Sequence, residues 1–275
     1  AGSAIEKRHT VIDDYDKEPS DYSFYPPNRE LSPSPGTEKR NDIFIREANA
    51  LSLEASTGLL EGFPHIRPSD ITHLITVSCT GFSAPGFDIH LVKELGLSRS
   101  ARRYHLGFMG CYAALTGLSL AWEICRSQPD AKVLLVNVEL CSIHLQQKKD
   151  LDSLVANAIF ADGASAALIT GNPDDATGKH LALDSFHSQF LHDSEDDMAW
   201  KIGNTGFDMK LSAYVPRIIN KNIHDVLGNL LAKSDLRQEE IDIWAIHPGG
   251  KAILQKVETA LGIAPSELQP SYDVL

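Results

Sequence analysis

Cys111 stands in the stretch GFMGCYAAL, residues 107–115, between a glycine and a run of small residues. The preceding stretch, 102–108, is typical of a strand, and 111–127 is predicted to be helical. A thiol at a helix N-terminus receives the partial positive charge of the helix dipole, which lowers its pKa and favours the nucleophilic thiolate. Gly110 leaves room for a substrate. The alternative is an ordinary buried cysteine, and this stretch alone leaves both interpretations open.

His247 stands in WAIHPGGKAI, residues 244–253. It ends a predicted buried strand, and a glycine pair and a helix follow it. Sites in α/β proteins lie at the carboxyl edge of the sheet, and the glycines leave room for a ligand. A Cys and a His far apart in sequence, each at a strand-to-helix junction, are typical of a thiol nucleophile with an imidazole partner. The alternative is an ordinary histidine, one of 11 in the chain.

The elements that must position these residues alternate between strands and helices. Apolar runs predict strands at 73–79, 102–108, 131–140, 159–170, 180–190 and 241–247. Periodicity and proline positions predict helices over 37–60, from Pro85 to about Leu95, over 111–127 and 215–232, and from about Lys251. Thr37 with Arg40 and Asn41 gives a capping-box pattern without the ideal Glu, after an extended loop over 10–37. This alternation implies a parallel sheet covered on both faces, and the second half repeats the layout of the first.

Composition limits the class of protein. A chain of 275 residues, 43% of them hydrophobic, suits an α/β protein with a substantial core. The formal net charge of −12 argues against a general nucleic-acid surface. The four cysteines have no paired spacing, so neither a disulfide framework nor a metal site is expected.

Location and charge give further expectations. The longest apolar runs, such as VLLVNVEL, are too short to span a bilayer, and AGSAIEKRHTV lacks the apolar region of a signal peptide, so a cytoplasmic protein is expected. Two basic stretches are candidates for binding an anionic ligand: EKRH, with Lys7 and Arg8, and LSRSARR, with Arg99, Arg102 and Arg103. The second is more typical of a solvated face.

Several motifs occur together in a fixed order: VSCTGFSAPG, GFMGCYAA, LDSLVANAIFADGASA, IGNTGFDMKLS and WAIHPGGKAIL. In this order and spacing the chain closely resembles type III polyketide synthases, the chalcone synthase-like enzymes of the thiolase superfamily. The resemblance covers essentially the whole chain. The CS-x-H and W-x-IGN-x-GF variants are closer to bacterial alkylpyrone and alkylresorcinol synthases than to chalcone synthase.

The resemblance implies roles for individual residues. Cys111 matches the acyl-carrying nucleophile, and His247 matches the histidine that pairs with the thiolate and helps polarise the malonyl thioester carbonyl. Phe160, which the residues alone identify only as a core aromatic, matches the gatekeeper between the coenzyme A tunnel and the pocket. Met209 stands where plant members carry a second Phe, which implies a different pocket.

Further positions match the family's substrate contacts. Those that line the pocket are Cys79, Thr80, Cys141 and His144. Ala84 matches the residue that reaches into the neighbouring subunit's pocket, so a homodimer is expected. Those that match contacts to coenzyme A are Lys7, Arg8, Gly249 and Gly250.

The implied fold class is α/β: a thiolase-like fold of two related α/β halves in a layered αβαβα arrangement. Residues 1–153 would form the half with the nucleophile, and residues 154–275 the half with the histidine. The fold is expected to be incomplete at both termini. The family's opening strand, its last strands and the Asn of its Cys-His-Asn triad have no counterpart in this chain.

The implied function is an acyltransferase reaction. An acyl-coenzyme A starter loaded on the cysteine is condensed with malonyl-coenzyme A by decarboxylation, with coenzyme A thioesters as substrates and no cofactor. One alternative is a non-catalytic fragment that binds acyl-coenzyme A or a partner, which the missing Asn favours and the intact Cys111 and His247 oppose. Another is a ketoacyl synthase III-like single condensation, against which the motifs GFDMKLS and HPGG argue.

Overall fold

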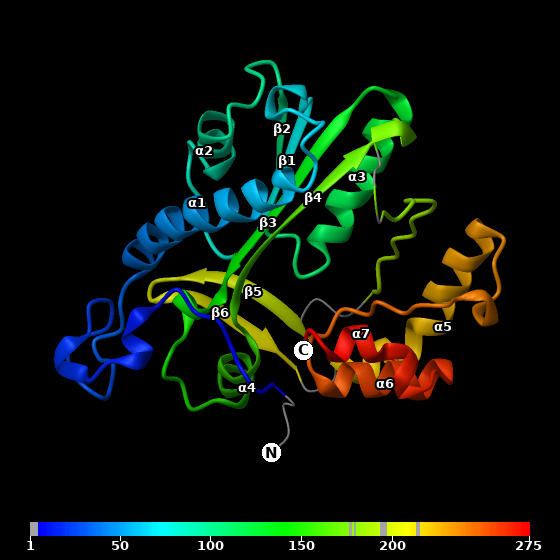
Figure 1. Ribbon diagram of the computed structural model, residues 1–275. Coiled ribbons are helices and arrows are strands. Elements are labelled where there is room, and N and C mark those ends of the chain that lie inside the picture. The colour runs from blue at the N-terminus through cyan, green and yellow to red at the C-terminus, as the bar shows by residue number, and fades with distance from the viewer. Residues whose placement is uncertain (1–4, 176–177, 179, 193–196, 213–214) are drawn as a thin grey trace.

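The computed structural model describes residues 5–175, 178, 180–192, 197–212 and 215–275 (Figure 1). Its helices are α1 (Thr37–Glu61), α2 (Phe87–Glu94), α3 (Ala113–Ser127), α4 (Leu151–Ile159), α5 (Val215–Ser234), α6 (Lys251–Leu261) and α7 (Gln269–Tyr272). Its strands are β1 (His73–Ser78), β2 (Arg102–Gly107), β3 (Lys132–Leu140), β4 (Asp162–Thr170), β5 (Met198–Gly203) and β6 (Gly206–Leu211). Within these ranges no helix is both long enough and apolar enough to cross a bilayer.

The main sheet has the strand order β2-β1-β3-β4. β1 is parallel to β2 and to β3, as the sequence predicts, but β4 is antiparallel to β3. The physical reason is the connection between them: β3 ends at Leu140, β4 begins opposite it at Asp162, and α4 lies at that same end. The chain therefore returns along the sheet in the reverse direction. β4 lies beyond residue 153, and the division of the chain at that residue stays a prediction.

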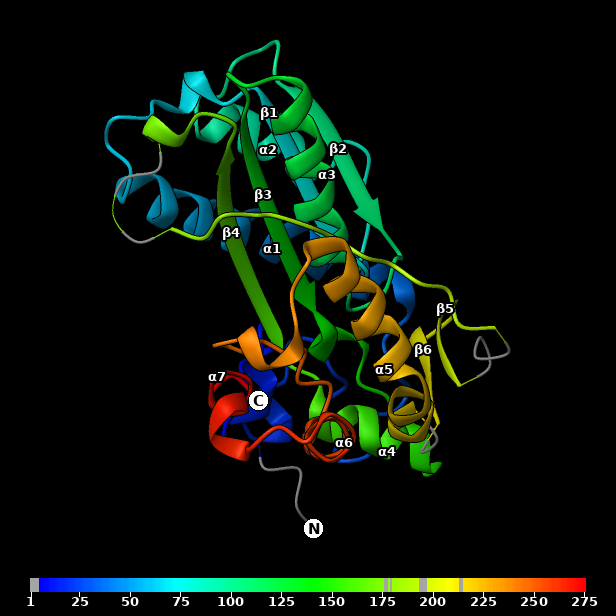
Figure 2. The same ribbon diagram turned by 90° about the vertical axis from the view of Figure 1, so that its right-hand side faces the viewer.

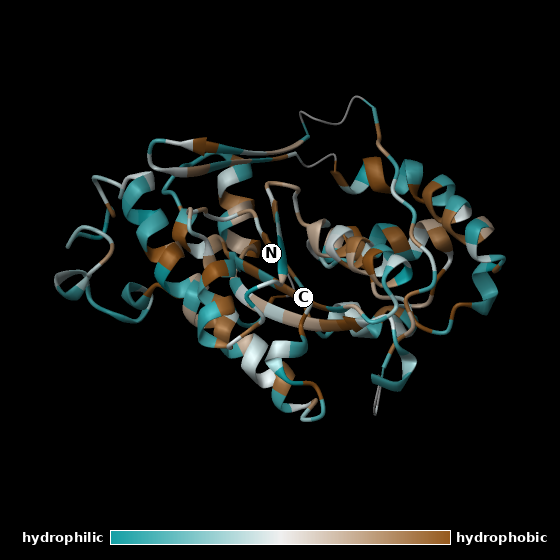
Figure 3. Cartoon of the chain, turned by 90° about the horizontal axis from the view of Figure 1, so that it is seen from above, coloured by the Kyte–Doolittle hydropathy of each residue, from teal (hydrophilic) through white to brown (hydrophobic). Residues whose placement is uncertain are grey.

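Helices cover both faces of this sheet, as predicted. α1 and α2 lie on one face and α3 on the other (Figures 1 and 2). Alternate residues of β1 supply the two cores: Leu74 packs in a cluster with Phe44 of α1 and Leu91 of α2, and Ile75 packs in a cluster with Ala121 of α3. Figure 3 shows the hydrophobic residues of these elements in brown. Successive side chains of a strand point to opposite faces of the sheet. Because both faces are covered here, the strand appears in the sequence as a continuous apolar run.

Two predicted helix starts and one predicted cap are wrong in detail. α2 begins at Phe87 after the N-cap Gly86, so Pro85 precedes the helix instead of opening it. α3 begins at Ala113, two residues after Cys111. No capping box forms at Thr37, because its hydroxyl donates to the Gly203 carbonyl and accepts from another backbone N–H of the β5–β6 hairpin. A contact from across the chain has replaced the local cap.

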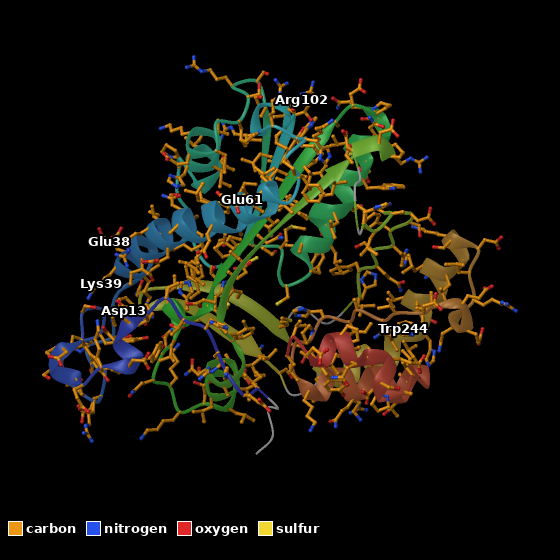
Figure 4. All side chains as sticks on the ribbon, in the orientation of Figure 1. Asp13, Glu38, Lys39, Glu61, Arg102 and Trp244 are labelled. Atoms are coloured by element: carbon orange, nitrogen blue, oxygen red, sulfur yellow. The ribbon has the colours of Figure 1, made fainter. Side chains whose placement is uncertain are left out.

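The C-terminal part is built from α5, α6 and α7, which pack around a small core that includes Trp244, labelled in Figure 4. The strands predicted at 180–190 and 241–247 are wrong: these segments are not strands in the described chain. A strand persists only where a neighbouring strand satisfies its N–H and C=O groups, and the described residues supply neither segment with such a partner. Apolar side chains on both segments are exposed, Leu181 at 92% and Ile243 at 71%.

Two elements were not predicted. α4 starts at a side-chain cap in which Asp150 accepts a hydrogen bond of 2.9 Å from the Ser153 backbone nitrogen. The β5–β6 hairpin pairs Gly203 with Gly206 around a two-residue turn. The D-x-x-S spacing and the flanking glycines are the signals that local analysis could have used. Both elements frame the cavity described below.

Candidate active site

Cys111 lies in the irregular stretch between β2 and α3. Two residues there have a left-handed backbone, Phe108 with φ of 55° and Gly110 with φ of 87°. Gly110 can hold this conformation without a side-chain clash, whereas Phe108 is strained by it. The turn leaves Cys111 exposed beyond the end of the strand. The predicted position at a strand-to-helix junction is confirmed, although Cys111 precedes the helix by two residues.

A half-buried acid, Glu139 of β3, lies beneath this turn. The Cys79 backbone nitrogen donates to both of its carboxylate oxygens, at 2.9 and 3.0 Å, and the Thr80 hydroxyl donates to one of them at 2.8 Å. The Cys79 thiol accepts a hydrogen bond of 3.3 Å from the Gly110 nitrogen, next to Cys111. Desolvation raises the pKa of Glu139 to about 7, against the hydrogen bonds that favour its ionised form.

This environment raises the pKa of the Cys111 thiol. Desolvation is the first cause, and the charges of Glu139 and Cys79 follow. The lowering expected from the helix dipole is not found, because the helix starts too late and an acid lies close by. Within the described chain no hydrogen bond joins Cys111 to His247, and desolvation lowers the pKa of that imidazole. The structure does not bring the two predicted partners into contact.

Three aromatic rings form a wall beside the turn at Cys79 and Thr80. The Trp200 indole donates a hydrogen bond of 2.7 Å to the Cys79 carbonyl. His144 Nδ1 accepts from the Phe207 backbone nitrogen at 3.1 Å, so the ring proton is on Nε2, which donates to the Thr80 carbonyl at 2.6 Å. Desolvation lowers the pKa of His144 to about 4, so the ring is neutral at physiological pH. His144 also stacks on Phe207, with ring centroids 4.0 Å apart.

A cavity of about 380 Å³ lies on the other side of this wall. Of the predicted pocket and coenzyme A residues, those that line it are Arg8, Cys141, His144, Phe160 and Met209. The predicted residues that do not line it are Lys7, Cys79, Thr80, Ala84, Cys111, His247, Gly249 and Gly250. Cys111 is nevertheless close to it, because Trp200 lines the cavity and bonds to Cys79, whose thiol contacts Gly110.

The cavity has charged groups of both signs. Arg8 is held by a hydrogen bond from its guanidinium to the Asn157 carbonyl, and Lys148 forms an ion pair of 2.5 Å with Asp208. That ion pair lowers the pKa of Asp208. Arg8 is exposed and forms no ion pair with an acid of the described residues, so its charge is available to an anionic group.

The remaining predicted residues lie outside the cavity. Lys7 and Ala84 are exposed at the surface. Gly250 is the N-cap of α6 with φ of 130°, a conformation that favours glycine, and a Cβ there would lie 3.5 Å from Ile159 of α4. Gly249 lies against the His247 ring. The loop after His247 therefore meets the helix that carries Phe160 at its C-cap.

Sequence reasoning missed two residues of this site. Glu139 is the single charged residue in the buried run VLLVNVEL, and a lone acid in such a strand is a usable signal for a functional or strained site. Trp200 had no comparable signal. Its role depends on the β5–β6 hairpin reaching the turn after β1, a contact between residues far apart in the sequence.

Both parts of the chain match models of one protein family. Residues 3–173 match the family model of chalcone and stilbene synthases, N-terminal domain, and residues 182–275 match the C-terminal domain of the same family. The chain is 36% identical over 239 residues to the alpha-pyrone synthesis polyketide synthase-like Pks18 of Mycobacterium tuberculosis, covering 86% of this chain and 60% of that protein. It is 34% identical over 243 residues to type III polyketide synthase B of Arabidopsis thaliana, covering 86% and 62%. The chain thus spans about 60% of the length of these curated relatives.

Solved structures agree with the family match. The fold superposes on PKS-I from the brown alga Ectocarpus siliculosus with a TM-score of 0.92 and 31% identity, covering 100% of this chain and 73% of that one. It superposes on 1,3,6,8-tetrahydroxynaphthalene synthase from Streptomyces coelicolor with a TM-score of 0.82 and 28% identity, covering 89% and 69%. The predicted thiolase-like α/β fold class is confirmed. Because the family models match both parts of the chain, this protein belongs to the chalcone and stilbene synthase family, the type III polyketide synthases.

Proposed function

We propose that the protein condenses an acyl-coenzyme A starter with malonyl-coenzyme A through a thioester on Cys111. The observation that carries this proposal is the family match over both parts of the chain, with a cysteine at the turn between β2 and α3. In the first step the Cys111 thiolate attacks the thioester carbonyl and coenzyme A leaves as its thiolate. Malonyl-coenzyme A then loses carbon dioxide, and its enolate attacks the Cys111 thioester, which releases the thiolate again.

The proposed substrate route runs through the cavity beside the aromatic wall. Phe160 and Met209 both line it, which suits their proposed roles at the entrance to the acyl pocket. Arg8 is the proposed contact for a phosphate of coenzyme A, because it lines the same cavity and no acid in the described part of the chain pairs with its charge. The proposed contacts of Lys7, Gly249 and Gly250 with coenzyme A are supported only by the resemblance of the sequence around these residues to the family.

The raised pKa of Cys111 requires a base for the first step. His247 is the proposed base, because its lowered pKa keeps the imidazole neutral and able to accept a proton. This role requires the loop that carries His247 to approach Cys111. We also propose a homodimer, a cytoplasmic location and turnover without a further cofactor.

A second candidate function is binding of acyl-coenzyme A without turnover. It is favoured by the raised pKa of Cys111 and by the absence of a hydrogen bond between Cys111 and His247 in the described chain. Both candidates use the same cavity. They differ in whether a covalent bond forms on the thiol.

Intact-mass measurement after incubation with a fatty acyl-coenzyme A separates these candidates. If the catalytic proposal holds, the mass of the protein increases by that of the acyl group. This increase is expected to be absent in Cys111→Ala and present in the matched control Cys125→Ala. A pyrone or resorcinol product on addition of malonyl-coenzyme A completes the test. Binding without any adduct, measured by calorimetry, refutes the catalytic proposal for this chain and supports the second candidate.

A further inference from the structure

A buried arginine, Arg40 in the first turn of α1, lies behind the cavity and does not line it. The residue is 0% exposed, and Figure 4 labels its neighbour Lys39 at the start of the helix. No acid in the described part of the chain forms an ion pair with the Arg40 guanidinium. A buried charge without an acid partner costs free energy of folding, and an apolar side chain of similar size is often as stable or more stable. Stability of the core therefore does not explain this arginine.

The Arg40 guanidinium holds the backbone on both sides of His144. Its Nη1 atom donates to the Ile143 carbonyl and to the Leu145 carbonyl, the second at 3.2 Å. His144 ends the short 3₁₀ helix Cys141–His144 that follows β3. The last C=O groups of a helix have no partner within it, so a donor from another part of the chain is needed. Arg40 supplies that donor from α1.

Other contacts fix the guanidinium itself. Its Nε atom donates to the Pro35 carbonyl at 2.9 Å, and its Nη2 atom donates to the Ser34 hydroxyl at 2.8 Å. The guanidinium carbon lies 5.5 Å from the centroid of the Phe24 ring. Because the guanidinium is planar and rigid, these contacts also determine the direction in which Nη1 points. The arginine is therefore a fixed anchor for the segment that it holds.

That segment forms part of the cavity wall. Every residue of 141–146 lines the cavity except Ile143, which is 0% exposed. The His144 ring is bonded at both nitrogens, to the Thr80 carbonyl and to the Phe207 backbone nitrogen. These two bonds orient the ring, and the bonds from Arg40 hold the backbone that carries it.

Arg40 also packs against the β5–β6 hairpin, which supplies the rest of the aromatic wall. A Cβ atom at Gly206 would lie 3.0 Å from Arg40 Cδ and 3.1 Å from Nε, so a glycine here leaves room for the arginine. The next residue, Phe207, stacks on His144 with ring centroids 4.0 Å apart. One buried side chain thus contacts both segments from which the wall is built.

We propose that Arg40 is a positioning residue for recognition of the acyl group, because it fixes the backbone on both sides of His144 and so fixes the ring in the cavity wall. This inference rests on the proposed use of the cavity by the starter. Arg40 contacts no substrate and acts through His144. Without the anchor, segment 141–146 can move toward the cavity, which reduces the room for a long acyl chain more than the room for a short one.

Arg40→Met tests the proposal, since it removes the donors and keeps a side chain of similar length. Intact mass measures the rates at which dodecanoyl- and acetyl-coenzyme A acylate Cys111. We expect the ratio of the two rates to fall by about tenfold or more, because one methylene in a pocket already changes selectivity by about 10–200-fold. The structural control is Leu60→Ala, a buried position at the other end of α1, which is expected to lower stability and leave the ratio unchanged. If the parent protein forms no adduct, the proposed catalysis fails, and calorimetric affinities for the two thioesters replace the rates.

A spectroscopic readout is independent of turnover. In nitrogen-15 spectra of the parent protein, His144 is expected to show a protonated Nε2 and an unprotonated Nδ1, assigned by their loss in His144→Gln. Both signals are expected to shift in Arg40→Met and to stay in place in Leu60→Ala. Arg40→Lys keeps one charged donor, so its ratio and signals are expected to lie between those of the parent and Arg40→Met.

Circular dichroism checks the fold, and Arg40→Lys replaces Arg40→Met in the comparison if the methionine variant does not fold. The proposal is overturned by an unchanged ratio, by unmoved His144 signals, or by equal changes in Leu60→Ala. Loss of the fold in both Arg40 variants would also overturn it, in favour of a purely structural role.

Discussion

Glu139 and Cys79 are joined by two hydrogen-bond contacts, in which the Cys79 backbone nitrogen lies 2.9 and 3.0 Å from the two carboxylate oxygens. The Cys79 thiol accepts a hydrogen bond from Gly110, and Cys111 is the next residue. This half-buried acid therefore acts on three thiols: desolvation raises the pKa of Cys79, Cys111 and Cys141, and the charge of Glu139 raises it further. A carboxyl whose own pKa is about 7 can change this effect across the physiological range.

Replacing Glu139 by Gln is expected to speed alkylation of Cys111 at pH 8. The acid is ionised there, so its removal takes away a negative charge that opposes the thiolate. At pH 6 the acid is mostly protonated, and the difference from the parent protein is expected to shrink. Iodoacetamide labelling followed by peptide mass analysis measures the rate at Cys111. Glu123→Gln, on the exposed side of α3, is the control, and identical rates in all three proteins at pH 8 would contradict the prediction.

Local pattern predicted the features whose signals lie within one short segment of the sequence. The buried run of β1 and the turn around Cys111 were found because their signals are apolar period and glycine position, which single segments carry. The strand predicted over 241–247 was not found, because an apolar run defines a strand only when another strand pairs with it. Glu139, His144 and Trp200 form hydrogen bonds with residues at least 59 positions away, and no local pattern encodes such contacts.

Trp200→Phe is expected to destabilise the protein while keeping a ring in the cavity wall. The substitution removes the indole donor and leaves the half-buried Cys79 carbonyl without its 2.7 Å hydrogen bond, a loss of about 1 kcal/mol. Urea unfolding measures the free energy. Trp122→Phe is the matched control, because that indole packs against the Arg126 guanidinium and the Phe186 ring. Equal losses in the two variants would show that ring volume, and not the hydrogen bond, carries the effect.

Asp14→Asn is expected to destabilise the N-terminal loop. One carboxylate oxygen of Asp14 accepts from the Ser23 nitrogen at 2.8 Å, and the other accepts from the Phe24 and Tyr25 nitrogens, both at 2.8 Å. An amide group cannot accept on both sides, so a loss of about 2–4 kcal/mol is expected from the unpaired N–H groups. The neighbouring Asp13→Asn changes the same charge at an 81% exposed side chain and is expected to have little effect.

The pH dependence of the same loop follows from the lowered pKa of Asp14. Burial raises this pKa, and the hydrogen bonds from Ser23, Tyr25 and Phe24 outweigh burial. The folded state therefore prefers the ionised acid. The stabilisation is present above the ordinary value of 3.8 and is lost as the pH falls through the lower folded-state pKa. Acid unfolding curves of Asp14→Asn are expected to lack this component, and curves parallel to those of the parent protein would contradict the assignment.

His144 and Glu139 are expected to give opposite pH dependences of stability between about pH 4.5 and 6.5. The pKa of His144 is about 4 in the fold and 6.5 ordinarily, so the unfolded chain takes up a proton first as the pH falls, and stability decreases toward acid. The pKa of Glu139 is about 7 in the fold and 4.5 ordinarily, so the unfolded chain loses its proton first as the pH rises, and stability decreases toward neutral pH. Each shift corresponds to a free energy on the order of 3 kcal/mol.

Single variants are expected to expose these two slopes, which largely cancel in the parent protein. Relative to the parent, Glu139→Gln leaves the His144 slope uncompensated, so stability is expected to rise with pH over this window. His144→Gln keeps an amide that can donate to the Thr80 carbonyl and accept from the Phe207 nitrogen, and its stability is expected to fall with pH instead. Urea unfolding at several pH values measures the free energy of unfolding of each variant. Subtracting the value of the parent protein at the same pH cancels the contribution of the other acids. Variants whose curves both run parallel to the parent would show that neither group changes its pKa on folding.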